Sequence, residues 1–162
     1  VAIGVARGAL DAFSDLAQNK IPLMMSSSLA NRPIAQYRMG ECEAKLRAAR
    51  AFFMESMQAV HDELEAGLES PSPEGTLYGR LSCTYAANAA MEVVDVIHNT
   101  AGTSGMRMYS PLERKLRDAH GCATHRWVSH PLYQDMGMYF LGLEPPPEFL
   151  GLADAGPPPP PK

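Results

Sequence analysis

Long apolar segments, cysteine and aromatic residues are all scarce in this chain of 162 residues. No run of about 20 apolar residues occurs, so we expect no membrane-spanning helix. The three cysteines, Cys42, Cys83 and Cys122, are odd in number and far apart. Their spacing fits neither a disulfide scaffold nor a metal-binding knuckle, and it favours a reducing, cytoplasmic location. A net charge of −4 argues against nucleic-acid binding, which requires a basic face.

The start of the sequence lacks the features of a targeting segment. It reads VAIGVARGALDAF, with no initiator Met, no basic stretch and no cleavage site. We therefore expect no signal peptide, and we interpret the chain as a piece of a longer protein.

Strand signals are also nearly absent. No stretch alternates apolar and polar residues between turns, and neither Asn-Gly nor Asp-Gly occurs. Apolar residues instead recur at spacings of three and four, which is typical of helices. The sequence thus predicts an all-α fold, with helices over about 2–18, 33–65, 76–99 and 111–123.

The second predicted helix is much longer than an average helix, so it must pack along other long helices in a bundle or across subunits. We expect its buried stripe to consist of large and small apolar residues, namely Ile34, Tyr37, Cys42, Leu46, Ala49, Phe53, Met57, Val60 and Leu64. In the third helix, small residues would let neighbouring helices approach closely; these are Ala86, Ala87, Ala89 and Ala90.

Proline and serine mark the predicted boundaries. Residues 70–75, Ser-Pro-Ser-Pro-Glu-Gly, are expected to form a loop. Ser110 is expected to cap the fourth helix and to form a capping box with Glu113. The tail over 145–162 contains eight prolines and is expected to be disordered or polyproline II near its end.

Histidine offers the most obvious chemistry, because a neutral imidazole suits general acid–base catalysis near neutral pH. His61 lies among charged residues and is expected at the surface. His120, His125 and His130 are spaced by five, which turns successive side chains of a helix about 140° apart. A helical metal pair prefers a spacing of four, so we expect no metal site.

The glycine-rich segment 99–105, Asn-Thr-Ala-Gly-Thr-Ser-Gly, allows two interpretations. Its backbone amides and hydroxyls could hold a phosphate, or it could be an ordinary turn that ends a helix. The Gly-Lys-Ser/Thr ending of a Walker loop is missing. Local sequence alone leaves both interpretations open.

Three segments in the right order resemble the C-terminal domain of the acyl-CoA dehydrogenase superfamily over about residues 1–144. They are 99–118, with its glycine turn followed by Pro-Leu-Glu-Arg-Lys-Leu-Arg-Asp, and 4–13 and 29–36. The resemblance implies an up-and-down four-helix bundle in a homotetramer. It also implies a flavin that lies between the domains of one subunit and a neighbouring subunit.

Within that superfamily the chain looks like the flavin-dependent monooxygenase branch, the oxygenase components of two-component aromatic hydroxylases. The dehydrogenases' Gly-Thr-x-Glu-Ile segment is missing after Asp118, and the chain reads DAHGCATHRW instead. The branch implies that His125, or as second choice His130, lies beside the flavin. The expected cofactor is reduced FMN or FAD, the partners a flavin reductase and a small organic substrate. Contacts to the flavin phosphate are implied for Gly102, Thr103, Ser104, Asn99 and Arg32.

Two alternatives remain at this point, an FAD-dependent acyl-CoA dehydrogenase and a non-catalytic helical oligomerisation module. Arg117 and Asp118 match family positions, and we interpret them as a buried pair that fixes the fourth helix to the bundle. Loss of one partner from such a pair would cost about 3–5 kcal/mol.

Overall fold

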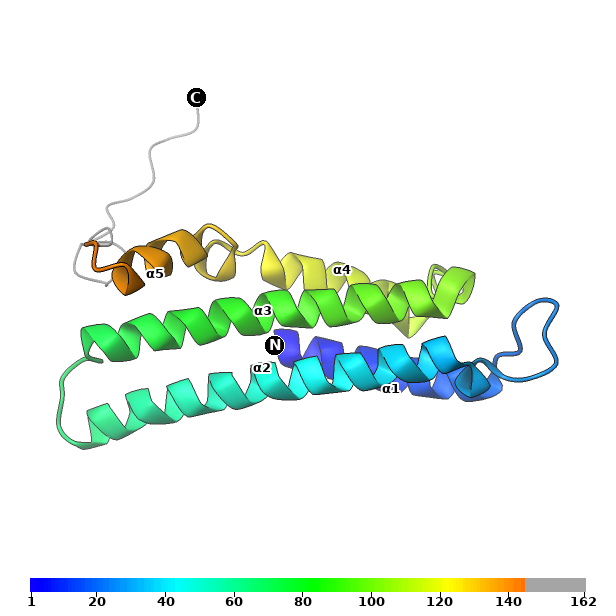
Figure 1. Ribbon diagram of the computed structural model, residues 1–162, viewed down its shortest axis with the longest axis horizontal. Helices are drawn as coiled ribbons and strands as arrows, with labels where there is room; N and C mark the ends of the chain where they lie inside the picture. Colours follow the sequence, from blue (N-terminus) through cyan, green and yellow to red (C-terminus); the bar gives the residue numbers. More distant parts are fainter. Residues whose placement is uncertain (145–162) are drawn as a thin grey trace, which may run out of the picture.

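The computed structural model describes residues 1–144, and all regular structure within them is helical. The long helices are α1 (Ala2–Asn19), α2 (Pro33–Glu65), α3 (Pro73–Ala101) and α4 (Pro111–Ala123), followed by the shorter α5 (Leu132–Phe140). Three single 3₁₀ turns connect them: η1 (Leu29–Asn31), η2 (Gly102–Ser104) and η3 (Arg126–Val128). The first four helices run up and down (Figure 1), which confirms the predicted fold. The proline-rich tail, 145–162, lies outside the described residues.

Helix α3 is the centre of the bundle, because α1, α2, α4, α5 and η3 all pack against it. Its four predicted contact residues, Ala86, Ala87, Ala89 and Ala90, are each at most 5% exposed. Small side chains at these positions let the neighbouring helices approach, as the sequence predicts. Phe13 and Leu10 of α1 fill the core beside Val93, Val94 and Ile97 of α3.

The buried stripe of α2 differs from the prediction at both ends. Ile34, Tyr37 and Leu64 are 52%, 62% and 41% exposed. The buried positions are Ala35, Cys42, Leu46, Ala49 and Ser56. Their spacing of seven, four, three and seven is the repeat of closely packed helices, and most of these side chains are small. The prediction assigned large apolar residues to the buried face. The face of α2 that packs against α3 instead has mostly small side chains.

Helix α3 begins three residues earlier than predicted, so the loop assignment is wrong for 73–75. Ser72 caps the helix by accepting a hydrogen bond from the backbone N–H of Gly75 (2.9 Å). The Glu63 carboxylate accepts two further bonds, from the Ser72 backbone N–H (2.8 Å) and hydroxyl (2.6 Å). These two bonds hold the pKa of Glu63 below its ordinary value. The cap therefore also joins the end of α2 to the start of α3.

We expect Ser72→Ala to lower the free energy of unfolding by about 1 kcal/mol, the usual cost of losing an N-cap. Because the pKa of Glu63 is lowered in the folded state, its contribution to stability is present at neutral pH and is lost as pH falls through that lowered pKa. Urea unfolding at pH 7 and pH 3 measures both effects. Ser70→Ala, at an exposed position nearby, is the control. Equal losses for the two variants at pH 7 would contradict the role of the cap.

The start of α4 confirms the cap and corrects two other predictions. The Ser110 hydroxyl accepts from the Leu112 backbone N–H (3.3 Å). Glu113 does not complete a capping box, because its carboxylate accepts two bonds from Arg117 one turn later (2.8 and 3.0 Å). Arg117 and Asp118 are not a buried pair: their side chains are 70% and 45% exposed, and Asp118 lies 3.7 Å from Arg114. The large stability cost predicted for that pair therefore does not apply.

Helix α5 was not foreseen from the sequence. It packs on α3 through Met136, which is 1% exposed and lies against Leu77. With nine residues and a central Gly137, the segment has little helical propensity of its own. Tertiary contact with α3 therefore stabilises it, and such contact leaves a weak signal in a short sequence window.

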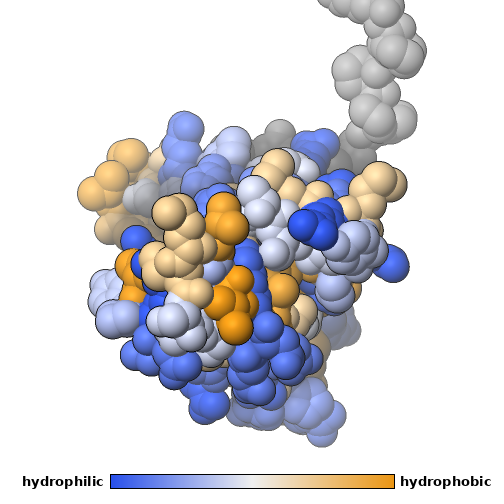
Figure 2. Space-filling model, turned by 90° about the vertical axis from the view of Figure 1, so that its right-hand side faces the viewer, coloured by the Kyte–Doolittle hydropathy of each residue, from blue (hydrophilic) through white to orange (hydrophobic). Residues whose placement is uncertain are grey.

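Apolar side chains gather at the end of the bundle where α1 joins α2 and α3 joins α4 (Figure 2). The exposed residues of the two connections include Ile21, Leu23, Met24, Met106, Met108 and Tyr109. None of the helices in residues 1–144 combines the length and apolarity that crossing a bilayer requires.

Candidate functional site

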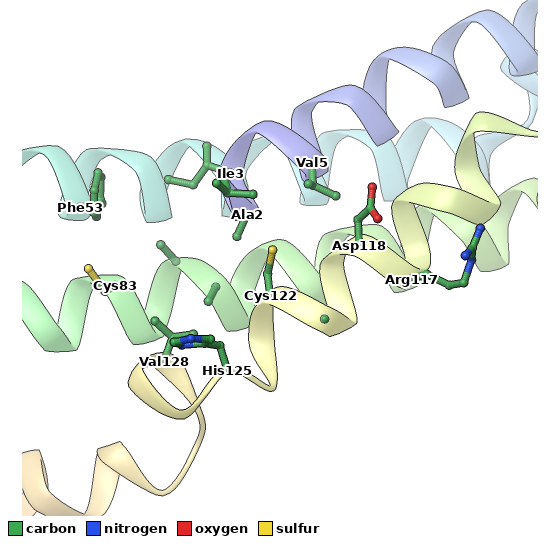
Figure 3. A pocket seen from close by; sticks show the side chains of 14 residues that line it. Ala2, Ile3, Val5, Phe53, Cys83, Arg117, Asp118, Cys122, His125 and Val128 are labelled. Atoms are coloured by element: carbon green, nitrogen blue, oxygen red, sulfur yellow. The ribbon is translucent and has the colours of Figure 1, made fainter. Parts of the chain in front are cut away.

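A pocket of about 750 Å³ opens beside α3, where α1 begins and α4 ends (Figure 3). It lies over the hairpin that α2 and α3 form. The start of α1 and the end of α4 form two walls, and the middle of the hairpin forms the floor. The lining side chains include Ile3, Phe53, Cys83, Cys122 and His125.

The pocket is mostly apolar, with its polar groups concentrated on α4 and the segment after it. Ala86, Ala87 and Val128 provide apolar surface, whereas Asp118 and His125 provide groups that can exchange a proton. Burial raises the pKa of the Cys83 thiol, which therefore stays protonated and uncharged near neutral pH. The pocket thus suits a largely apolar organic molecule with a few polar atoms.

His125 lies at the edge of this pocket, as the N-cap of η3. Its Nδ1 accepts a hydrogen bond from the Trp127 backbone N–H at 3.4 Å. A neutral imidazole that accepts at Nδ1 carries its proton on Nε2. His125 therefore has one ring nitrogen occupied by the backbone and the other available to donate to a bound molecule.

The other histidines lie elsewhere. His130, the second choice, stacks edge-on against Tyr133 with ring centroids 5.8 Å apart, and it does not line the pocket. His120 Nε2 lies 2.8 Å from Asp95 Oδ1, which links α4 to α3. His61 is exposed, as predicted. Within residues 1–144, no three His, Cys, Asp or Glu side chains come together in a way that could hold a metal ion.

Two of the predicted phosphate contacts share a second hollow, a groove of about 470 Å³ between the start of α2 and the end of α3. Arg32 and Asn99 both line it, together with Arg38, which belongs to none of the predicted contacts. The Arg38 guanidinium also donates to Glu41 at 2.7 Å and stacks over the Tyr37 ring. Two guanidinium groups on one groove suit an anionic ligand.

The glycine turn fits both interpretations of its sequence. Gly102 ends α3 with φ of 61°, a conformation that favours glycine. Thr103 is exposed and Ser104 half-buried just beyond it. The end of α3 is the negative pole of the helix dipole, which disfavours a phosphate. Lys20 offsets this charge, because its amine donates to the Ala101 carbonyl at 2.7 Å.

The predicted site is therefore split in two. Ala87 in the pocket and Asn99 in the groove lie twelve residues apart on α3, about 18 Å at ~1.5 Å per residue. That span exceeds the ribityl chain between the ring and the phosphate of FMN. The sequence missed Phe53, Cys83, Arg38 and Lys20, because only the packing of different helices brings these residues to the two hollows.

Comparison with known proteins supports the resemblance. Residues 1–130 match the family described as "Acyl-CoA dehydrogenase, C-terminal domain". An indole-3-acetate monooxygenase from Pseudomonas putida is 38% identical over 150 residues, which cover 93% of this chain and 38% of that protein. The oxygenase component of an FADH₂-dependent resorcinol hydroxylase from Rhizobium sp. is 25% identical over 151 residues, which cover 88% and 37% of the two chains.

A solved structure shows the same fold. XiaF from Streptomyces sp., in complex with FADH₂ and glycerol, aligns with a TM-score of 0.79 at 20% identity, covering 89% of this chain and 37% of that chain. The present chain thus spans less than two fifths of the length of these relatives.

Proposed function

Because the chain belongs to the acyl-CoA dehydrogenase family, as its C-terminal domain, we propose that it is part of a flavin-dependent monooxygenase that oxygenates a small organic molecule. The observation that carries the proposal is the position of His125, at the edge of an apolar pocket with Nε2 free to act on a bound molecule. The names of the relatives, indole-3-acetate monooxygenase and resorcinol hydroxylase, support the same reaction class.

The pocket residues define what this chain contributes to such a reaction. Reduced flavin, when bound, reacts with O₂ and supplies the oxygen atom that is transferred. The apolar surface formed by Ile3, Ala86 and Val128 keeps water away from the reacting atoms. His125 Nε2 holds a proton beside them, or takes one from an acidic hydroxyl of the substrate.

The groove offers the partners that the phosphates of a flavin need. Arg32 and Arg38 supply charge-assisted hydrogen bonds, and Asn99 supplies a neutral one. Gly102, Thr103 and Ser104 lie at the same end of α3, where backbone and hydroxyl donors can approach a phosphate without a Cβ in the way at Gly102. Paired guanidinium groups favour the pyrophosphate of FAD over the single phosphate of FMN. The resorcinol hydroxylase is named as FADH₂-dependent, and XiaF was solved in complex with FADH₂.

The distance between the groove and the pocket favours a flavin that lies between two copies of the chain. A flavin whose ring lies at His125 of one copy would need a phosphate site beyond the same copy's groove, and the groove of a second copy offers the matching groups. We infer a homo-oligomer, a tetramer by resemblance, in which the helical domain covers residues 1–144 and the rest of each protein closes the pocket. A separate flavin reductase would supply the reduced cofactor, and the location would be cytoplasmic.

An oxygenation assay of the full-length protein tests this function. The protein receives reduced FAD or reduced FMN, ¹⁸O₂ and a panel of hydroxylated and indolic aromatic acids. We expect one ¹⁸O atom in the product. Oxidation of acyl-CoA with an electron acceptor and without O₂ would instead favour the dehydrogenase. A colourless full-length protein that binds neither flavin would favour the oligomerisation module.

Arg32→Ala should weaken binding of the reduced flavin roughly tenfold or more, because a charge-assisted hydrogen bond contributes about 1.5–3 kcal/mol. Titration of the full-length protein with reduced FAD, followed by fluorescence under anaerobic conditions, gives the affinity. Arg50→Ala is the matched control, because Arg50 is an exposed arginine of α2 that does not line the groove. If the two variants bind FAD equally well, the groove is not the phosphate site.

A further inference from the structure

We propose that Asn88 is the positioning residue for His125, a role that rests on the function proposed above. Asn88 lies on α3, five residues after the pocket residue Cys83 and next to Ala87, and it is 3% exposed. Its amide nitrogen donates to the backbone carbonyl of Val128 at 3.2 Å. This hydrogen bond joins the central helix to the short segment that carries the histidine.

The hydrogen bond from Asn88 holds Val128, the last residue of the short η3 turn. Val128 donates its own N–H to the carbonyl of His125 at 3.0 Å, which closes the η3 turn. Inside that turn the Trp127 N–H donates to His125 Nδ1. Anchoring the Val128 carbonyl therefore fixes the backbone on which the imidazole is mounted and the N–H that orients its ring.

A polar side chain at position 88 destabilises the core, so packing alone does not explain why asparagine stands there. Its amide nitrogen also donates to Thr84 O within α3 at 2.8 Å, so both partners are acceptors and the orientation of the amide is settled. Its Oδ1 is buried without a hydrogen-bond partner. A buried acceptor left unpaired destabilises a core, and an apolar residue would avoid that penalty. The cross-helix bond to Val128 is what an apolar residue could not provide.

The segment packs on α3, and Asn88 adds a side-chain hydrogen bond between the two. Arg126 and Trp127 are exposed, and the Arg80 guanidinium of α3 lies over the Trp127 ring at 5.1 Å. His125 itself is exposed. We expect loss of the Asn88 amide to let the turn move away from α3 more easily, and to take the imidazole with it.

The test uses full-length protein carrying Asn88→Ala or Asn88→Ser. Serine can still bond Thr84 O but is too short to reach Val128, so it removes the cross-helix contact with less disturbance and serves where alanine fails to fold. The control is Thr84→Val, which changes a buried neighbour whose hydroxyl has no hydrogen-bond partner. Trypsin cleavage after Arg126, followed by mass spectrometry, reports the freedom of the segment independently of flavin chemistry.

We expect both Asn88 variants to accelerate cleavage after Arg126 about fivefold or more, the factor that corresponds to one net hydrogen bond. Formation of product should fall at least tenfold in kcat with little change in KM. Added to His125→Ala, the Asn88 substitution should cause no further loss in kcat, because both act through one imidazole. Thr84→Val should change neither measurement.

Three results would overturn the proposal, at different points. Unchanged cleavage after Arg126 shows that Asn88 does not anchor the segment. A further loss of kcat in the double variant shows that Asn88 acts by another route than His125. Faster cleavage together with full activity, in a protein whose His125→Ala variant is also fully active, places the failure in the proposed role of His125 and not in the contact.

Discussion

Substitution of His125 by alanine in the full-length protein is expected to lower kcat for the oxygenated product by about 10²-fold or more. Proton transfer by a positioned side chain typically contributes a factor of 10² to 10⁴. The imidazole can act in this way because Trp127 N–H occupies Nδ1, which leaves Nε2 available, and because His125 lines the pocket. Product formation from reduced flavin and O₂, measured by chromatography, gives the rate.

Binding of reduced flavin should stay within about twofold in this variant, because the charged contacts proposed for the flavin phosphates, Arg32 and Arg38, are unchanged. His61→Ala, at an exposed position near the end of α2, is the control for the loss of an imidazole as such. His130→Ala tests the second choice. Full activity of His125→Ala together with a large loss in His130→Ala would move the catalytic role to His130, although His130 packs against Tyr133 outside the pocket.

The helices were predictable because their signals are local. The Pro residues at 33 and 111 and the Ser at 110 mark helix starts that the structure reproduces. The start of α3 was missed because its cap depends on a carboxylate from the previous helix, Glu63, as well as on Ser72. Which face of a helix is buried depends on its neighbours, so Ile34 was wrongly assigned to the core in place of Ala35.

Parts of the candidate site could be proposed from the sequence only where a motif lies in one stretch of chain. His125 and the glycine turn belong to such stretches, and the structure brings them to a pocket and to a helix end. Asn88 and Cys83 gain a role only when α3 packs against the segment after α4, some forty residues later in the chain. Family patterns also do not reveal whether a charged pair is buried, as the exposure of Arg117 shows.

Phe13→Ala is expected to cause the largest loss of stability, about 3–5 kcal/mol in the free energy of unfolding. Phe13 is 2% exposed and is the largest of the fully buried side chains in residues 1–144. It lies in the core shared by α1, α2, α3 and α4. Removing the ring therefore takes away apolar contacts on several helices and leaves a cavity that backbone packing prevents from closing.

Urea unfolding of the 162-residue chain, followed by circular dichroism at 222 nm, measures this loss. Phe140→Ala is the matched control, because Phe140 is 54% exposed and packs at its edges against Tyr78 and Tyr139. We expect it to cost about 1 kcal/mol, in keeping with an aromatic pair at the surface. Similar losses for the two variants would show that the bundle does not depend on the shared core around Phe13. In that case the position of α1, and with it the wall of the pocket that Ile3 forms, would need another source of stability.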